Sequence, residues 1–135
     1  MDAASLAEIP LFAELSDEER DRLAAVCTEA EAEAGTTLVQ EGDFGYSMFA
    51  IVSGEADVTR DGVLVHTLGP GEVFGEIAVM SSGKRVATVT AKSDMRLIVV
   101  LNRDLWRVDR DSPGLSASLA QTIADRRLAL ERASS

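Results

Sequence analysis

The sequence predicts a single domain, residues 1–135, that is built mainly of β-strands and carries helices at both ends. Two patterns predict this class. Between residues 35 and 101, short apolar segments alternate with glycines, which is typical of many short strands joined by turns. On either side of this block, apolar residues recur at the spacing of an amphipathic helix. The strand pattern fits a sandwich, a jelly roll or a barrel.

An amino-terminal helix is predicted over residues 17–28. Ser16 stands three residues before Glu19, which is the spacing of a capping box, and apolar residues such as Leu23 follow at helical spacing. The run at residues 29–34 alternates Glu and Ala, and this pattern fits both a solvated helix end and an edge strand. We expect solvated surface without a function there.

Within the β block, residues 35–101, a hairpin and a buried strand are the best-defined elements. Asp61-Gly62 is a turn-prone pair, flanked by residues 55–59 and by Val63–Leu68, which predicts a hairpin. The continuous aliphatic run at residues 97–101 predicts a strand that is buried on both faces.

The carboxyl-terminal part, residues 102–132, is predicted to form helices. Asn102 can cap a short helix through Val108, and Ser112-Pro113 is an N-cap followed by proline at the first helical position. A longer helix then presents one apolar stripe, formed by Leu115, Leu119 and Ile123. This stripe would either pair with a second copy of the chain, giving a homodimer, or pack on the domain's own strands.

Composition limits the classes of partner. The net charge of −10 argues against generic binding to nucleic acid or to an anionic membrane, so an anionic ligand would need a local positive site. Cys27 is the only cysteine, which excludes an internal disulfide and is typical of a reducing compartment. We find no export signal and no apolar run long enough to span a bilayer. A cytoplasmic location is therefore expected.

Residues 71–89 carry the most specific chemical pattern. Gly75 allows a close backbone turn, and residues 76–80 could form one helical turn whose free N–H groups face an anion. The planar guanidinium of Arg85 could bind two phosphate oxygens, and the carboxylate of Glu76 could accept a hydrogen bond from a sugar hydroxyl. In the alternative interpretation, these two side chains form an ordinary surface ion pair and the glycines only shape turns.

The order of short motifs adds a resemblance. Residues 74–78 and 85–89 closely resemble the phosphate-binding cassette of the cyclic nucleotide-binding domain family. Upstream segments look like the same family's strand and turn signatures, in the same order, at residues 41–43, 48–55 and 69–72. The resemblance covers about residues 10 to 130. It implies an antiparallel, jelly-roll-like β-roll framed by amino-terminal helices, a short hinge helix and a carboxyl-terminal helix.

The resemblance also implies a ligand and a set of contacts. The ligand would be cyclic AMP, with cyclic GMP as the alternative, and no further cofactor is implied. Glu76 would bind the ribose 2′-hydroxyl and Arg85 the exocyclic phosphate oxygens. Backbone contacts would come from Gly75, Ile77, Ala78 and Ala87.

Two positions depart from the family's pattern. Lys84 replaces a proline that often precedes the arginine, which removes a rigid φ. Val86 has no hydroxyl to bond a guanine amino group, and this favours adenine. Candidates for capping the adenine are Ile123, Arg126 and Arg127, which also fit helix packing and exposed charge at a helix end.

The implied function is a regulatory sensor without catalytic activity, in which ligand binding repacks the carboxyl-terminal helices. A metal-dependent barrel enzyme would need several His or carboxylate ligands, whereas His66 is the only histidine. No motif supports Cys27 as a nucleophile. The alternative function is a structural or protein-interaction module that keeps the fold without binding nucleotide. The sequence does not indicate the effector, whether a partner protein or another domain. Direct binding to DNA is not expected, because residues 1–135 contain no helix-turn-helix after the predicted long helix.

Overall fold

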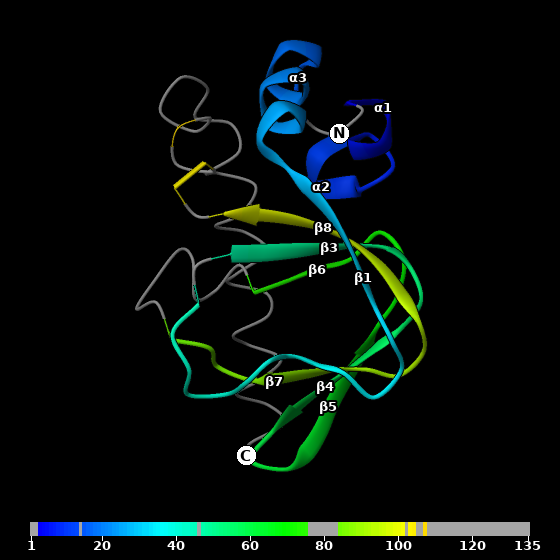
Figure 1. Ribbon diagram of the computed structural model, residues 1–135, viewed down its shortest axis with the longest axis vertical. Helices are drawn as coiled ribbons and strands as arrows, with labels where there is room; N and C mark the ends of the chain where they lie inside the picture. The colour runs from blue at the N-terminus through cyan, green and yellow to red at the C-terminus, as the bar shows by residue number, and fades with distance from the viewer. Residues whose placement is uncertain are drawn as a thin grey trace.

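The computed structural model describes residues 3–13, 15–45, 47–75, 84–101, 103, 104 and 107. In this part of the chain, three helices come first: α1 (Ala3–Leu6), α2 (Pro10–Ala13) and α3 (Asp17–Val26). The strands follow as β1 (Thr28–Ala32), β2 (Thr37–Val39), β3 (Ser47–Ser53), β4 (Ala56–Arg60), β5 (Val63–Leu68), β6 (Val73–Phe74), β7 (Thr88–Ala91) and β8 (Met95–Leu101). Figure 1 shows these elements along the chain.

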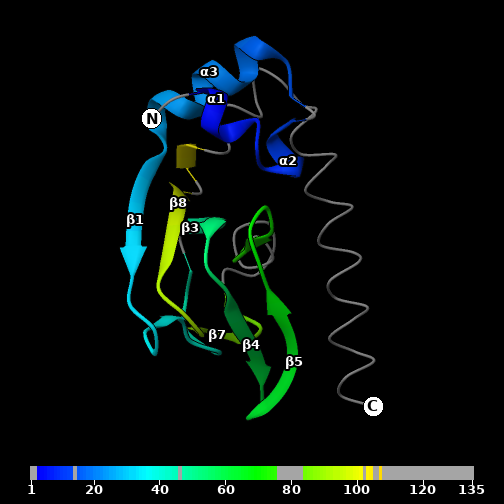
Figure 2. The same cartoon turned by 90° about the vertical axis from the view of Figure 1, so that its right-hand side faces the viewer.

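The strands form two antiparallel sheets. One sheet has the order β1-β8-β3-β6 and the other the order β2-β7-β4-β5. Strands adjacent in a sheet are mostly distant in sequence, as in β8 between β1 and β3, so the chain crosses repeatedly from one sheet to the other. The predicted mainly β class, with strands rolled into two facing layers, is confirmed (Figures 1 and 2).

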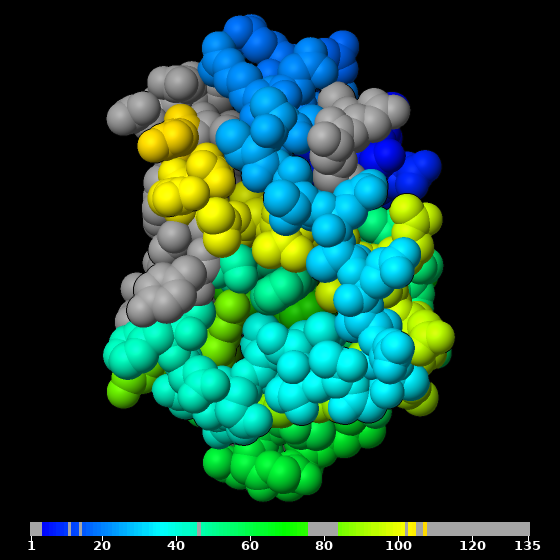
Figure 3. All heavy atoms as spheres, viewed as in Figure 1, coloured from blue at the N-terminus to red at the C-terminus, as the bar shows by residue number. Residues whose placement is uncertain are grey.

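The core has two parts. Between the sheets lies a mainly aliphatic cluster that includes Ile51, Leu68 and Leu97; its buried members come from β2 to β8, and Ala30 and Ala32 of β1 pack against it. A second cluster joins the amino-terminal helices to the sheet that contains β3 and β8, through side chains such as Phe12, Leu23 and Ile98. The helices therefore cover one end of the strands (Figure 2), and in Figure 3 the β4–β5 hairpin lies at the opposite end of the molecule.

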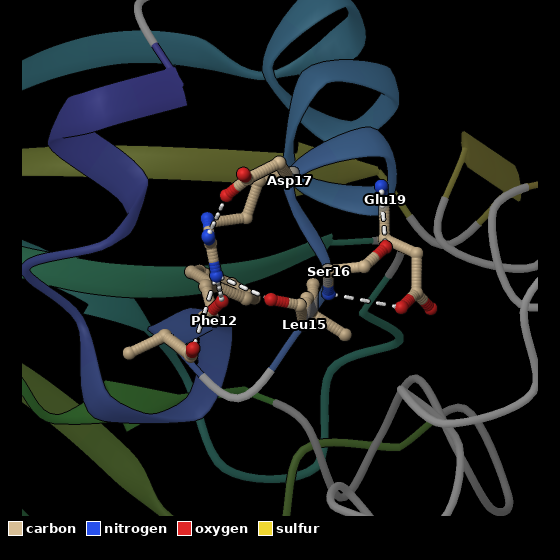
Figure 4. Close-up of polar contacts among 7 residues, drawn as sticks. Phe12, Leu15, Ser16, Asp17 and Glu19 are labelled. Atoms are coloured by element: carbon tan, nitrogen blue, oxygen red, sulfur yellow. Dashed lines mark hydrogen bonds and ion pairs between the residues drawn. The ribbon is translucent and has the colours of Figure 1, made fainter.

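Helix α3 begins as predicted. Ser16 Oγ accepts a hydrogen bond from the backbone N–H of Glu19, and the Glu19 carboxylate accepts one from the N–H of Ser16 (Figure 4). The helix ends earlier than predicted, at Val26, because Cys27 is extended with ψ of 151° and Thr28 already pairs with Val99. A β-branched threonine suits a strand better than a helix end.

Strand β1 shows which of the two alternatives holds for the alternating Glu and Ala run. All of β1, residues 28–32, pairs antiparallel with β8, so the run begins as an edge strand and not as a helix end. Ala30 and Ala32 pack toward the core, while Glu29 and Glu31 are exposed. The strands thus begin before Gly35, where the sequence pattern places the start of the β block.

The predicted hairpin and the predicted aliphatic strand are confirmed. β4 and β5 pair through a turn in which Asp61 has φ of 52° and Gly62 has φ of 80°, the left-handed values that this two-residue turn requires. β8 lies between β1 and β3, and Leu97, Ile98 and Val100 are buried.

Candidate ligand-binding site

The backbone of Arg85 is tied to the turn that precedes β3. Its N–H donates to the carbonyl of Asp43 at 2.7 Å, and its own carbonyl accepts from the N–H of Gly42 at 2.9 Å. An isolated antiparallel bridge between Phe44 and Lys84 extends this pairing by one residue. Arg85 is therefore fixed by a segment about forty residues earlier in the chain.

The turn is itself braced from the strand that follows Arg85. Thr88 Oγ1 accepts hydrogen bonds from the N–H of Glu41 at 3.0 Å and from Gln40 Nε2 at 3.3 Å. The carboxylate of Glu41 accepts from the N–H of Asp61 at 3.0 Å, at the tip of the β4–β5 hairpin. The backbone around Arg85, the turn and the hairpin tip form one connected hydrogen-bond network.

The side chain of Arg85 is buried, with only 8% of the residue exposed. Its Nη1 donates to the carbonyl of Gly75 at 3.0 Å, and its Cζ lies 5.9 Å from the centre of the Phe49 ring. Phe49 in turn stacks on Phe74, with ring centres 4.9 Å apart. Because a buried charge is costly unless polar groups and aromatic faces stabilise it, this arrangement holds the guanidinium in one place.

The backbone conformation at position 75 requires a glycine. Its φ is +84°, and a Cβ there would lie 2.6 Å from Arg85 Nη1 and 3.1 Å from the carbonyl oxygen of Ser47. Only glycine fits both the left-handed backbone and the close approach. The predicted pair of Gly75 and Arg85 is thus brought together.

Val86 and Ala87 continue directly from Arg85. Ala87 is buried in a small apolar cluster with Val58, Val65 and Val86. Their side chains therefore pack at the start of β7. Their predicted contacts with a ligand remain predictions.

The other predicted site residues lie outside the described residues. They are Glu76, Ile77 and Ala78 in the segment after Gly75, and the adenine-capping candidates Ile123, Arg126 and Arg127. The predicted carboxyl-terminal helices also fall almost wholly outside, since only Arg103, Asp104 and Arg107 of that part are described.

Three residues of the site were not singled out by sequence reasoning: Gly45, Phe49 and Thr88. Gly45 is buried against the Arg85 side chain, Phe49 lies under its guanidinium and Thr88 braces the turn. Phe49 and Thr88 stand inside motifs that carried the resemblance, but nothing local in the sequence links either of them to Arg85.

Two cationic residues, Lys84 and Arg85, are neighbours in this acidic chain. The Nζ of Lys84 lies 5.7 Å from the centre of the exposed Phe44 ring. That these two cations provide a local positive site for an anionic ligand stays a prediction.

Comparison with known proteins identifies the family. A family model described as the cyclic nucleotide-binding domain matches residues 29–111. The chain belongs to this family. The cAMP-dependent protein kinase regulatory subunit of Yarrowia lipolytica is 39% identical to this cyclic nucleotide-binding domain over 101 residues, which are 73% of this chain and 27% of the relative.

Solved structures agree with this cyclic nucleotide-binding domain in fold. The regulatory domain of Toxoplasma gondii PKA, crystallised with cAMP, is 30% identical with a TM-score of 0.72, covering 78% of this chain and 42% of that one. The catabolite activator protein of Thermus thermophilus is 29% identical with a TM-score of 0.79, covering 93% and 63% respectively. The domain spans between 20% and 27% of the length of three such curated regulatory subunits, including that of Yarrowia lipolytica.

Within the described residues, no group of three or more His, Cys, Asp or Glu side chains could hold a metal ion. None of the helices in the same part of the chain has the length and apolar character needed to cross a membrane.

Proposed function

We propose that this domain is a regulatory sensor that binds a cyclic nucleotide, with a preference for cyclic AMP over cyclic GMP. The observation that carries the proposal is the Arg85 guanidinium. It is buried, fixed between the Gly75 carbonyl and the Phe49 ring, and it lies where the family's phosphate-binding cassette falls in this chain. A planar cation held in this way suits two oxygens of a cyclic phosphate.

The remaining contacts follow the sequence-based assignment. Glu76 would accept a hydrogen bond from the ribose 2′-hydroxyl, while backbone groups of Gly75, Ile77, Ala78 and Ala87 would line the phosphate and sugar. The Val86 side chain cannot bond a guanine amino group, which supports the preference for adenine. The relative from Toxoplasma gondii was crystallised with cAMP, which supports the same ligand here.

The output of the sensor would be movement of the carboxyl-terminal helices. Ligand would bind more tightly to a closed arrangement, in which residues 102–108 and 115–130 repack over the site, than to an open one. The relatives named as regulatory subunits support a role in controlling a partner protein or a further domain, rather than a catalytic role.

The test is isothermal titration of nucleotide-free protein with cyclic AMP and with cyclic GMP. We expect saturable binding that is tighter for cyclic AMP. Arg85→Ala should weaken it by roughly a hundredfold, since it removes charge-assisted hydrogen bonds to phosphate, and Glu76→Ala by about tenfold. Arg96→Ala is the matched control, because Arg96 is an exposed arginine on β8 whose loss should leave the affinity unchanged.

The competing function is an interaction module that keeps the fold without the ligand. It predicts no heat of binding and no thermal stabilisation with either nucleotide, for a protein whose folding is confirmed by circular dichroism. An equal affinity for cyclic AMP in the Arg85→Ala and Arg96→Ala variants would reject the assigned role of Arg85.

A further inference from the structure

Gly45 stands against the middle of the Arg85 side chain. A Cβ added at Gly45 would lie 2.8 Å from Arg85 Cδ and still closer to Nε and Cζ. Ordinary contacts of a Cβ begin near 3.4 Å, so a methyl group and the guanidinium cannot occupy their present places together. The space left by the missing side chain of Gly45 is the space that the guanidinium fills.

The backbone does not explain why this residue is glycine. Six other glycines have φ between +80° and +90°, where an L-residue is strained, but Gly45 is not among them. The three nearest atoms to its added Cβ all belong to the flexible side chain of Arg85, and none belongs to the backbone. Alanine can therefore take the conformation of Gly45, and the least costly response is movement of the guanidinium.

Gly75 differs from Gly45 in this respect. Its left-handed φ and the Ser47 carbonyl oxygen oppose a side chain independently of Arg85. A substitution at Gly75 would disturb the fold and the site together. Gly45 is the position at which the placement of the guanidinium can be altered with little effect on the backbone.

We propose that Gly45 is a positioning residue for the anion site: its missing side chain, together with the Phe49 ring and the Gly75 carbonyl, forms the slot that holds the Arg85 guanidinium in its ligand-binding position. This inference rests on the proposed function for the identity of the anion, a cyclic phosphate. Gly45 itself touches no ligand and acts only through Arg85.

The test compares Gly45→Ala with Gly69→Ala, each in the wild-type and in the Arg85→Ala background. Gly69 is the matched control, because its φ is also outside the left-handed region and nothing lies within 4 Å of its added Cβ. Two quantities are measured: the affinity for cyclic AMP and the midpoint of thermal unfolding without ligand.

In the wild-type background, Gly45→Ala should weaken cyclic AMP binding by about tenfold or more, while Gly69→Ala should stay within about twofold. Without ligand, Gly45→Ala should lower Tm by several degrees, because the displaced guanidinium loses its hydrogen bond and its place over the ring. In the Arg85→Ala background the same substitution should leave Tm unchanged or raise it, since alanine reduces the freedom of the unfolded chain.

An equal loss of Tm in both backgrounds would overturn the proposal, because it would show that the methyl group disturbs something other than Arg85. An affinity of Gly45→Ala equal to that of Gly69→Ala would also overturn it. If the wild-type protein binds no cyclic nucleotide, the proposed function fails, but the ligand-free comparison of Tm still decides whether Gly45 positions the guanidinium.

Discussion

Two largely buried arginines serve two different regions of this domain. Arg20, in helix α3, donates from Nη1 to the carbonyl oxygens of Phe12, at 3.3 Å, Ala13, at 3.0 Å, and Leu15, and it pairs with the carboxylate of Asp17 (Figure 4). Its acceptors are the end of α2 and the turn into α3. The side chain thus ties two helices together with groups of the chain itself.

Arg85 is placed by different means. Its guanidinium lies over an aromatic ring, next to two glycines, and its position depends on space and on a ring face as well as on the Gly75 carbonyl. The Arg20 side chain is 16% exposed and the Arg85 residue 8% exposed, so burial alone does not separate the two roles. Their described contacts differ: Arg20 bonds to backbone carbonyls and a carboxylate of the amino-terminal helices, whereas Arg85 lies over a ring and beside two glycines.

The largest expected effect is that of Arg20→Ala. It leaves the carbonyls of α2 and the following turn without their charged donor, so the free energy of unfolding should fall by about 2–3 kcal/mol. The affinity of the folded protein for cyclic AMP should remain within about twofold of wild type, since the hydrogen-bond partners of Arg20 lie in α2, in the turn into α3 and at the start of α3. Urea denaturation and titration calorimetry measure the two quantities. If Arg20→Ala lost as much affinity for cyclic AMP as Arg85→Ala, the assignment of a structural role to Arg20 and a binding role to Arg85 would be wrong.

Phe49→Leu tests whether the aromatic ring next to Arg85 contributes to ligand binding. Leucine fills much of the same volume but has no ring face, so cyclic AMP affinity should fall by about fivefold, corresponding to about 1 kcal/mol. Phe44→Leu is the control: that ring is 62% exposed and lies near Lys84 instead of Arg85. Equal affinities for the two variants, measured by calorimetry, would show that the ring under Arg85 does not contribute to binding.

Ser16→Ala tests the helix that carries Arg20. Removing the hydroxyl breaks one half of the capping box and should lower the free energy of unfolding by about 1 kcal/mol, with no change in nucleotide affinity. Chemical denaturation followed by circular dichroism gives the stability. The free energy of unfolding of Asp17→Ala is measured for comparison, because this variant keeps the Ser16 cap and removes the carboxylate that pairs with Arg20. If Ser16→Ala changed affinity and not stability, the amino-terminal region would belong to the site.

The features predicted correctly from the sequence are those set by neighbouring residues. The capping box depends on Ser16 and Glu19, which stand three positions apart, and the hairpin turn depends on Asp61 and Gly62. Gly75 and Arg85, which stand ten residues apart in one motif, do meet in the structure, while their contacts with a ligand stay predictions.

The features that sequence reasoning left open or missed depend on distant partners. The choice between a helix end and an edge strand at residues 29–34 stayed open in the sequence, and residues 28–32 form a strand because β8, more than sixty residues later, supplies the hydrogen-bonding edge. Gly45 and Phe49 meet Arg85 only after β3 and the turn before it have folded against residues 84 and 85. Glycine at position 45 looks in the sequence like one more turn residue, and its contact with a side chain forty residues away has no local signal.

The smallest expected effect concerns pH and the amino-terminal region. Burial raises the pKa of the Cys27 thiol from 9.0 to about 12, and this residue packs in the cluster beneath the helices that Arg20 joins. Well below pH 9 the thiol is neutral in the folded and unfolded states, so it causes no pH dependence there. Above pH 9 the unfolded chain loses the proton first, and the free energy of unfolding should therefore fall as pH rises toward 12.

Between pH 8 and pH 10 this contribution should be on the order of 1 kcal/mol, and it should be absent in Cys27→Ala. The measurement is the difference between the two proteins in urea denaturation at each pH, which removes the effects of other titrating groups. Affinity for cyclic AMP in the folded protein should not follow the thiol, because Cys27 packs in the cluster of the amino-terminal helices with Phe12 and Leu23. The same fall in the free energy of unfolding in wild type and Cys27→Ala would mean that another group titrates. A fall confined to wild type would assign the loss of stability at high pH to the amino-terminal region, which contains Arg20, and not to the anion site.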